Sequence, residues 1–186
     1  MQKQGNTQVY DPLTIVLHWG MTLMIIGLFF LGEYMVDLDY YDPWYIRAPD
    51  IHRSLGAITA MLLVLRLGWR WFSVHPMSIG RRWERLTALW VHRAFYSLIA
   101  AVVISGYLIT TADGQALSVF GWFEIPATLY GIENQEDIAG EFHEVLTDVL
   151  MVLMVFHGLA ALKHHFIDHD QVLRRMLGIK PGRSQV

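Results

Sequence analysis

Histidine is the residue type whose number and spacing in this chain could do chemistry. There are nine histidines and no cysteine among 186 residues. The lack of cysteine excludes disulfides, iron–sulfur clusters, thiol catalysis and haem attachment through a Cys-x-x-Cys-His motif. Two of the histidines, His143 and His157, are 14 residues apart. On a helix that spacing is just under four turns, so both side chains project from nearly the same face, separated by roughly 21 Å along the axis.

Five histidines fall at two depths when each is placed within its apolar segment at about 1.5 Å per residue. The inner level contains His18, His92 and His157, and the outer level contains His52 and His143. The iron of a b-type haem takes two axial imidazoles from facing helices, with the macrocycle between them. His52 supplies the outer partner for His143, whereas either His18 or His92 could pair with His157. Spacing alone therefore leaves the inner ligand open.

The alternative is that these histidines are ordinary polar groups. A lone histidine in a membrane helix often does no more than hydrogen-bond to a neighbouring helix. Four further histidines near the predicted span ends can simply be solvated: His75, His164, His165 and His169. Five histidines at two matching depths, with no cysteine or carboxylate cluster among them, favour two haem sites over this interpretation.

Arginine and glycine residues at matching positions support haem binding. Arg66 lies 14 residues after His52, near the inner level, where it could pair with haem propionates or extend toward the interface as a snorkelling side chain. Arg53 could serve the outer haem in the same way. Gly56 is one turn after His52, and Gly106 is 14 residues after His92. Glycine on a helix face lets a flat macrocycle approach closely, although small residues also serve plain helix packing.

The elements that must position these residues are long apolar helices. Hydrophobic residues make up 54% of the chain and charged residues 17%, and the mean hydropathy is positive, which is too apolar for a soluble domain of this length. The sequence predicts an all-α fold, an integral membrane four-helix bundle forming one domain, 1–186, without a cleaved signal peptide. Transmembrane helices are expected at about 12–35, 50–72, 86–112 and 140–167, and a flexible cytoplasmic tail at 176–186. Asp148, in the last span, is either a proton relay or an interfacial acid.

The distribution of Lys and Arg predicts the orientation of the bundle. One side is strongly basic, and its cations are Lys3, Arg66, Arg70, Arg81, Arg82, Arg85, Arg93, Lys163, Arg174, Arg175, Lys180 and Arg183. The other side has only Arg47 and Arg53, and its acids are Asp37, Asp39, Asp42, Asp50, Glu124, Glu133, Glu136, Asp137 and Glu141. Both termini are therefore expected in the cytoplasm.

Five sequence motifs carry a resemblance to a known family. They are "VLHW" around His18, "IHRSLG" around His52, "VHRAFYSL" around His92, "FHEVLTDVL" around His143, and "HGLAALKHHFID" from His157 followed by "VLRRM". Over nearly its whole length the chain resembles the bacterial cytochrome b561 family of small di-haem proteins of the inner membrane. The resemblance implies that His18 pairs with His157 on the cytoplasmic-side haem iron, and His52 with His143 on the periplasmic-side haem iron. His92 is then left for another role.

The function expected from this resemblance is electron transfer through two b-type haems, between a periplasmic redox protein or small molecule and the quinone pool, with ubiquinone as the exchange partner. Bis-imidazole iron has no open position, so catalysis at the metal is not expected; an enzymatic role would be that of a quinone-linked oxidoreductase. The residues that could handle quinone or protons are His92, Arg93, Lys163, His164 and His165.

Three other functions are alternatives to electron transfer between a periplasmic partner and quinone. A haem-bearing membrane-anchor subunit of a larger oxidoreductase fits the same features. Superoxide:ubiquinone oxidoreduction is another activity of the family, but the acidic outer loops would repel an anionic substrate. A solute transporter would need broken helices and internal repeats, and the sequence shows neither. Membrane lipid is an expected partner and nucleic acid is not.

Overall fold

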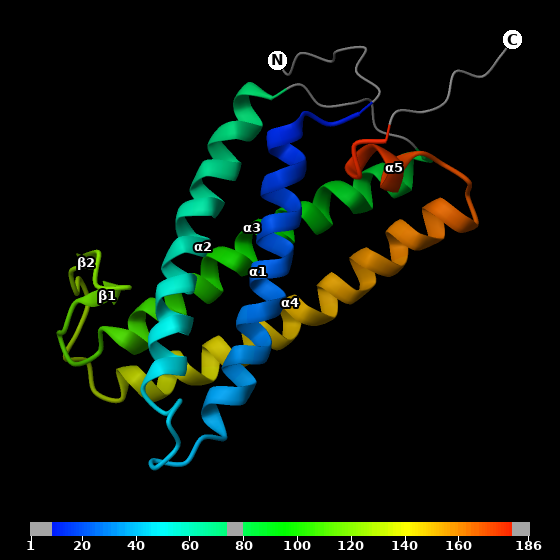
Figure 1. The fold of residues 1–186 in the computed structure, drawn as a ribbon. Coiled ribbons are helices and arrows are strands. Elements are labelled where there is room, and N and C mark those ends of the chain that lie inside the picture. The colour runs from blue at the N-terminus through cyan, green and yellow to red at the C-terminus, as the bar shows by residue number, and fades with distance from the viewer. Residues whose placement is uncertain (1–8, 74–79, 180–186) are drawn as a thin grey trace, which may run out of the picture.

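Four long helices dominate the fold of the computed structural model, which describes residues 9–73 and 80–179 (Figure 1). They are α1 Pro12–Val36, α2 Arg47–Phe72, α3 Arg82–Thr110 and α4 Gln135–Phe166. Each is long and apolar enough to cross a membrane, as the sequence predicts. An antiparallel hairpin, β1 Leu117–Val119 and β2 Phe123–Ile125, lies between α3 and α4, and the short α5, Val172–Met176, follows α4.

The bundle has two ends, which we call the α5 end and the hairpin end. The start of α1, the end of α2, the start of α3, the end of α4 and α5 itself lie at the α5 end (Figure 1). The α1–α2 connection, the hairpin, the end of α3 and the start of α4 lie at the hairpin end. The inner histidines belong to the α5 half and the outer histidines to the hairpin half.

A small apolar core separates these two halves. One buried residue from each long helix contributes to it: Met21, Leu63, Ile99 and Leu150. Leu150 lies seven residues from each of the two α4 histidines, so an apolar layer stands midway between the two histidine levels. Most other apolar side chains of the helices face outward, which is the arrangement expected of helices surrounded by lipid.

Local sequence explains how the bundle is held at its ends. Asp11 caps α1 by accepting a hydrogen bond from the Thr14 amide at 2.9 Å, and Pro12 occupies the first turn, where a missing N–H has no consequence. At the other end, the buried hydroxyl of Ser54 on α2 accepts a hydrogen bond from the Phe120 amide at 3.0 Å. This bond fixes the hairpin against α2.

The observed helices differ from the predicted spans mainly at their ends. Helix α2 begins at Arg47, three residues before the predicted start, and α3 covers residues 82–110 in place of 86–112. Helix α4 begins at Gln135 in place of residue 140, because the acids in its first turn favour a helix N-terminus although they are too polar for a hydropathy signal. Neither the hairpin nor α5 was predicted.

The predicted flexible tail, 176–186, lies only partly within the described residues. Its first residue is held by a contact, since the Trp19 indole N–H donates to the Met176 carbonyl at 3.0 Å. Residues 180–186 and His75 lie outside the described part of the chain.

Candidate functional site

Two pairs of histidines meet inside the bundle, one in each half. At the inner level the ring centroids of His18 on α1 and His157 on α4 are 6.3 Å apart, with an interplanar angle of 73°. At the outer level those of His52 on α2 and His143 on α4 are 6.2 Å apart, with an angle of 71°. The 14-residue spacing on α4 therefore gives each level one histidine, and a different helix supplies each partner.

These distances suit one metal ion between two imidazoles. A metal–imidazole nitrogen bond is about 2.0 Å long, and a five-membered ring with bonds of about 1.33 Å has a radius of about 1.1 Å. Two rings facing each other across one metal therefore have centroids about 6.2 Å apart. Both pairs have this separation, so the residues present fit a bis-imidazole haem iron at each level.

His92 lies at the inner level but has a different geometry. Its ring centroid is 5.5 Å from that of His157, at an angle of 82°, which is too short for a shared metal by the same reasoning. Its Nδ1 lies 2.6 Å from the carbonyl oxygen of Ala88, one turn earlier on α3. The geometry thus favours His18 over His92 as the partner of His157, a choice that spacing along the sequence left open.

Helix α3 orients the outer histidine on α4. The Nδ1 atom of His143 lies 3.0 Å from the carbonyl oxygen of Val102 and 3.0 Å from the hydroxyl of the buried Ser105. A neutral imidazole that donates from Nδ1 to a carbonyl has its free lone pair on Nε2, the nitrogen that would bind a metal. The contacts to α3 therefore present His143 in the tautomer that metal ligation needs.

Glycines make room for the outer pair. A Cβ added at Gly106 would lie 3.1 Å from Cε1 of His143, and one added at Gly32 would lie 3.4 Å from Cε1 of His52. An added Cβ at Gly56 would meet no atom within 4 Å, so space for a flat group exists one turn from His52. The role of Gly32 was not predicted, because it depends on the approach of α1 to α2 and leaves no signal in the sequence.

The two arginines predicted for cofactor binding have different surroundings. The Nη2 atom of Arg66 lies 3.0 Å from Nδ1 of His18, so this guanidinium is at the inner pair, as its sequence position suggests. Arg53 forms an ion pair with Asp50 and also donates to the Pro49 carbonyl at 3.3 Å. It is therefore already engaged at the exposed start of α2.

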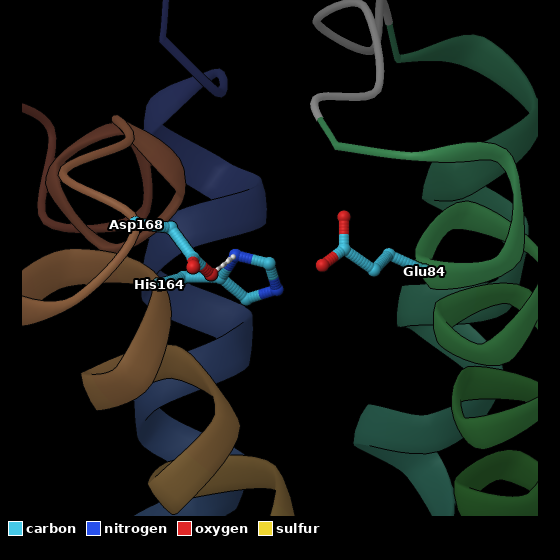
Figure 2. A group of neighbouring side chains, drawn as sticks. All are labelled: Glu84, His164 and Asp168. Carbon is cyan, nitrogen blue, oxygen red and sulfur yellow. Dashed lines mark ion pairs between the residues drawn. The ribbon is translucent and has the colours of Figure 1, made fainter.

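A polar pocket of about 530 Å³ lies at the α5 end, between the start of α3 and the end of α4. Figure 2 shows Glu84 of α3 directed across this pocket toward His164 and Asp168. Nδ1 of His164 lies 3.0 Å from a carboxylate oxygen of Asp168 and 2.8 Å from one of Asp170. The Lys163 ammonium lies 2.6 Å from Asp168 and 3.7 Å from Glu84. The carboxylates and imidazole of this cluster could bind a cation, but the Lys163 ammonium already pairs with Glu84 and Asp168.

The hydrogen bond from Lys163 lowers the pKa of Asp168 below its ordinary value, although partial desolvation acts in the opposite direction. Of the five residues predicted to handle quinone or protons, Lys163 and His164 belong to this pocket, whereas His92 faces the inner pair. Arg93 is exposed, with its guanidinium 5.0 Å from the Trp90 ring centroid, and the His165 ring packs against Phe166. Glu84, Asp168 and Asp170 were not predicted, because only folding brings them to His164.

Comparison with known proteins yields one family and several relatives. A family model described as prokaryotic cytochrome b561 matches residues 9–178. The chain is 47% identical over 180 residues to "Cytochrome b561 homolog 2" of Escherichia coli (strain K12), with 96% of each chain covered. It is 26% identical over 180 residues to "Probable superoxide oxidase CybB" of Yersinia pestis, covering 93% of this chain and 98% of that one. It is 24% identical over 183 residues to "Cytochrome b561 homolog 1" of Escherichia coli (strain K12), covering 95% and 98%.

Proposed function

Because the chain belongs to the prokaryotic cytochrome b561 family, whose members are electron-transfer cytochromes of the membrane with b-type haem, we propose that it carries two such haems. One is held between His18 and His157 and the other between His52 and His143. With both haems bound, the protein would relay electrons between a partner at the hairpin end and quinone at the α5 end. The observation that carries this proposal is the centroid separation of 6.3 Å and 6.2 Å in the two pairs.

Two histidines at each site suit electron transfer, because they would leave no free position on the iron for a substrate. When bound, each haem iron supplies a one-electron redox couple. Two histidines would hold each haem iron, and the Val102 carbonyl keeps the proton of His143 on Nδ1. The apolar layer around Leu150 excludes water between the two levels.

The α5 end faces the cytoplasm in this proposal. Among the described residues, this end holds many Lys and Arg side chains. The segments 37–53 and 113–141 at the hairpin end contain only two, Arg47 and Arg53. An excess of Lys and Arg marks the cytoplasmic side of membrane proteins. The start of α1 and the whole of α5, which lie at that end, are then on the cytoplasmic side.

The charge of the hairpin end bears on the identity of its electron partner. Residues 113–141 contain six carboxylates and no Lys or Arg. A surface of this sign repels a small anion such as superoxide and attracts a cationic partner. One relative is named a probable superoxide oxidase, but the acidic outer surface favours exchange with a redox protein or an uncharged small molecule here.

The pocket at the α5 end contains side chains that can exchange protons with a quinone. Reduction of a quinone takes up two protons for every two electrons, so the site requires groups that exchange protons. His164 lies seven residues after His157 on α4, which places it on nearly the same helix face, about 10.5 Å farther along the axis. With Asp168, Asp170 and Lys163 around it, His164 can pass protons to ubiquinone near the inner haem.

A haem-bearing anchor subunit of a larger oxidoreductase is the second candidate function. The observation that favours a protein neighbour is the hairpin, which is hydrogen-bonded to Ser54 of α2 and carries Trp122 with 76% of its surface exposed. Purification from mild detergent distinguishes the two functions. A stoichiometric partner that carries its own redox cofactor supports the anchor function, whereas a protein that exchanges electrons without one supports the independent relay.

Haem quantitation with a dithionite-reduced minus oxidised spectrum tests the main proposal. We expect two b-type haems per chain. Replacing His52 or His143 by alanine should remove only the outer haem, and replacing His18 or His157 only the inner one. His92→Ala is the matched control at the inner level and should retain both. A single haem in the native protein, or loss of the inner haem in His92→Ala but not in His18→Ala, would contradict the proposal.

A further inference from the structure

Two arginines on α2 lie at the inner level without a carboxylate partner. Arg66 and Arg70 are one turn apart, and the guanidinium carbon of each lies 5.9 Å from the centroid of the Tyr96 ring on α3. Neither is paired with a carboxylate among residues 9–73 and 80–179. The segments outside those ranges contain no Asp or Glu.

Partly buried arginines in a membrane protein are expected to have an anionic partner, because an unpaired charge is costly to remove from water. Asp11, at the same end of the bundle, is already engaged: it accepts hydrogen bonds from Thr14 at 2.9 Å and from the Trp69 indole at 3.0 Å. Lys163, by contrast, has two carboxylates beside it. Among residues 9–73 and 80–179, the arginine pair therefore has no carboxylate partner.

Ligation of His18 would increase this need. In the structure Arg66 lies 3.0 Å from Nδ1 of His18, and a guanidinium can only donate hydrogen bonds. A neutral histidine that ligates a metal through Nε2 has its proton on Nδ1, so it cannot accept a bond from Arg66 there. Metal ligation and the Arg66–His18 bond exclude each other, and Arg66 must then find another acceptor nearby.

We propose that Arg66 and Arg70, supported by Tyr96, form a binding site for two carboxylates, and that its ligand is the propionate pair of the haem held between His18 and His157. Guanidinium groups bind carboxylates through two parallel hydrogen bonds, so two arginines match two propionates. Arg66 and Arg70 of α2 would then hold the propionates of the inner haem. This inference rests on the proposed function, because it requires the inner haem. Arg70 is the new element, since nothing in the sequence separates it from the other cations at the α5 end.

The same chemistry could serve the phosphate of an anionic phospholipid, so the test must distinguish the two anions. Arg70→Gln is the informative variant, because Arg70 makes no contact with His18 that its loss would disturb. Arg85→Gln, an exposed arginine of α3 at the same end, is the matched control. Haem is removed by an excess of apomyoglobin, and the rate of loss is measured for protein reconstituted with protohaem or with its dimethyl ester, which has no propionate charge. The inner-haem phase is the one that persists in His52→Ala.

We expect Arg70→Gln to lose the inner protohaem about tenfold faster, which corresponds to the loss of one hydrogen bond between charged groups. With the dimethyl ester the variant and the native protein should lose the inner haem equally fast. Arg85→Gln should match the native protein with both haems, and Arg70→Lys should recover part of the effect, because it keeps the charge but not the planar fork.

Equal rates for Arg70→Gln and the native protein with protohaem would overturn the inference. If the same variant then retains less phosphatidylglycerol after purification, measured as phosphorus per chain, the site binds a lipid phosphate. Failure of the proposed function looks different: the native protein itself would lack the inner haem, or would keep it after His18→Ala.

Discussion

Replacement of Gly106 by alanine should disturb the outer histidine pair while leaving the bundle folded. The added Cβ would lie 3.1 Å from Cε1 and 3.4 Å from Nδ1 of His143. Carbon atoms in contact rest about 3.5–4.0 Å apart, so the ring must move by about 0.4 Å. Metal–ligand distances tolerate changes of about 0.2 Å. The movement therefore exceeds what an iron–imidazole bond accepts without reorientation of the ring.

The overall stability should change little, which makes the effect specific to the site. Movement of the ring away from α3 lengthens the 3.0 Å contact between Nδ1 and the Val102 carbonyl, and such a bond contributes about 1 kcal/mol. Alanine in place of glycine within a helix stabilises by about 0.5–1 kcal/mol, so the two effects nearly cancel. In preparations that retain both haems, the thermal unfolding midpoints of variant and native protein should therefore be close; loss of a bound haem would lower the midpoint by itself.

Haem content and electron paramagnetic resonance of the oxidised protein provide the assay. We expect the outer haem of Gly106→Ala to be lost or to show a shifted low-spin signal, and the inner haem to keep its own. Gly32→Ala is the matched control, because its Cβ would lie 3.4 Å from Cε1 of His52. The His52 ring would then need to move by only about 0.1 Å, which is less than the change of about 0.2 Å that a metal–ligand distance tolerates. Gly20→Ala, with no atom within 4 Å, controls for helix propensity. An unchanged outer signal in Gly106→Ala, or an equal shift in Gly32→Ala, would refute the reasoning.

Three further predictions concern the ends of the bundle. Ser54→Ala leaves the Phe120 amide without its acceptor, which costs about 1–3 kcal/mol; hydrogen exchange of residues 117–125 should quicken while the helices keep their protection. Burial would raise the pKa of Asp11, but its hydrogen bonds, including the one from Trp69, hold it below the ordinary value. Its contribution to stability is therefore present at neutral pH and is lost as the pH falls below about 4, the ordinary value, and through the lowered pKa of the folded protein, and Asp11→Asn should flatten the acid dependence of the unfolding midpoint. Trp19→Phe removes the hydrogen bond to the carbonyl at the end of α5, and amide exchange in α5 should rise selectively, whereas equal exchange in both proteins would argue against this contact.

The sequence predicted the general fold because its signals are local to each helix. Four apolar stretches of sufficient length correspond to the four helices that could cross a membrane, and the histidine motifs identified the family that the comparisons confirm. Helix ends were placed less well, since the first turn of α4 is acidic and exposed. The hairpin was missed because its short strands have no alternating pattern strong enough to stand out, and Val119 becomes fully buried only against α2.

Within one helix, sequence alone fixes which residues share a face, because the rise and rotation per residue are constant. The shared helix face of His143 and His157 was therefore readable from the sequence. How far one helix is rotated and shifted against its neighbours depends on the packing of all four at once, and the sequence of one segment does not contain that information. Spacing within the sequence left the choice between His18 and His92 to a family resemblance, and only the tertiary structure gives the ring separations from His157, 6.3 Å for His18 and 5.5 Å for His92. It also places Tyr96 of α3 beside Arg66 and Arg70, which share a face of α2.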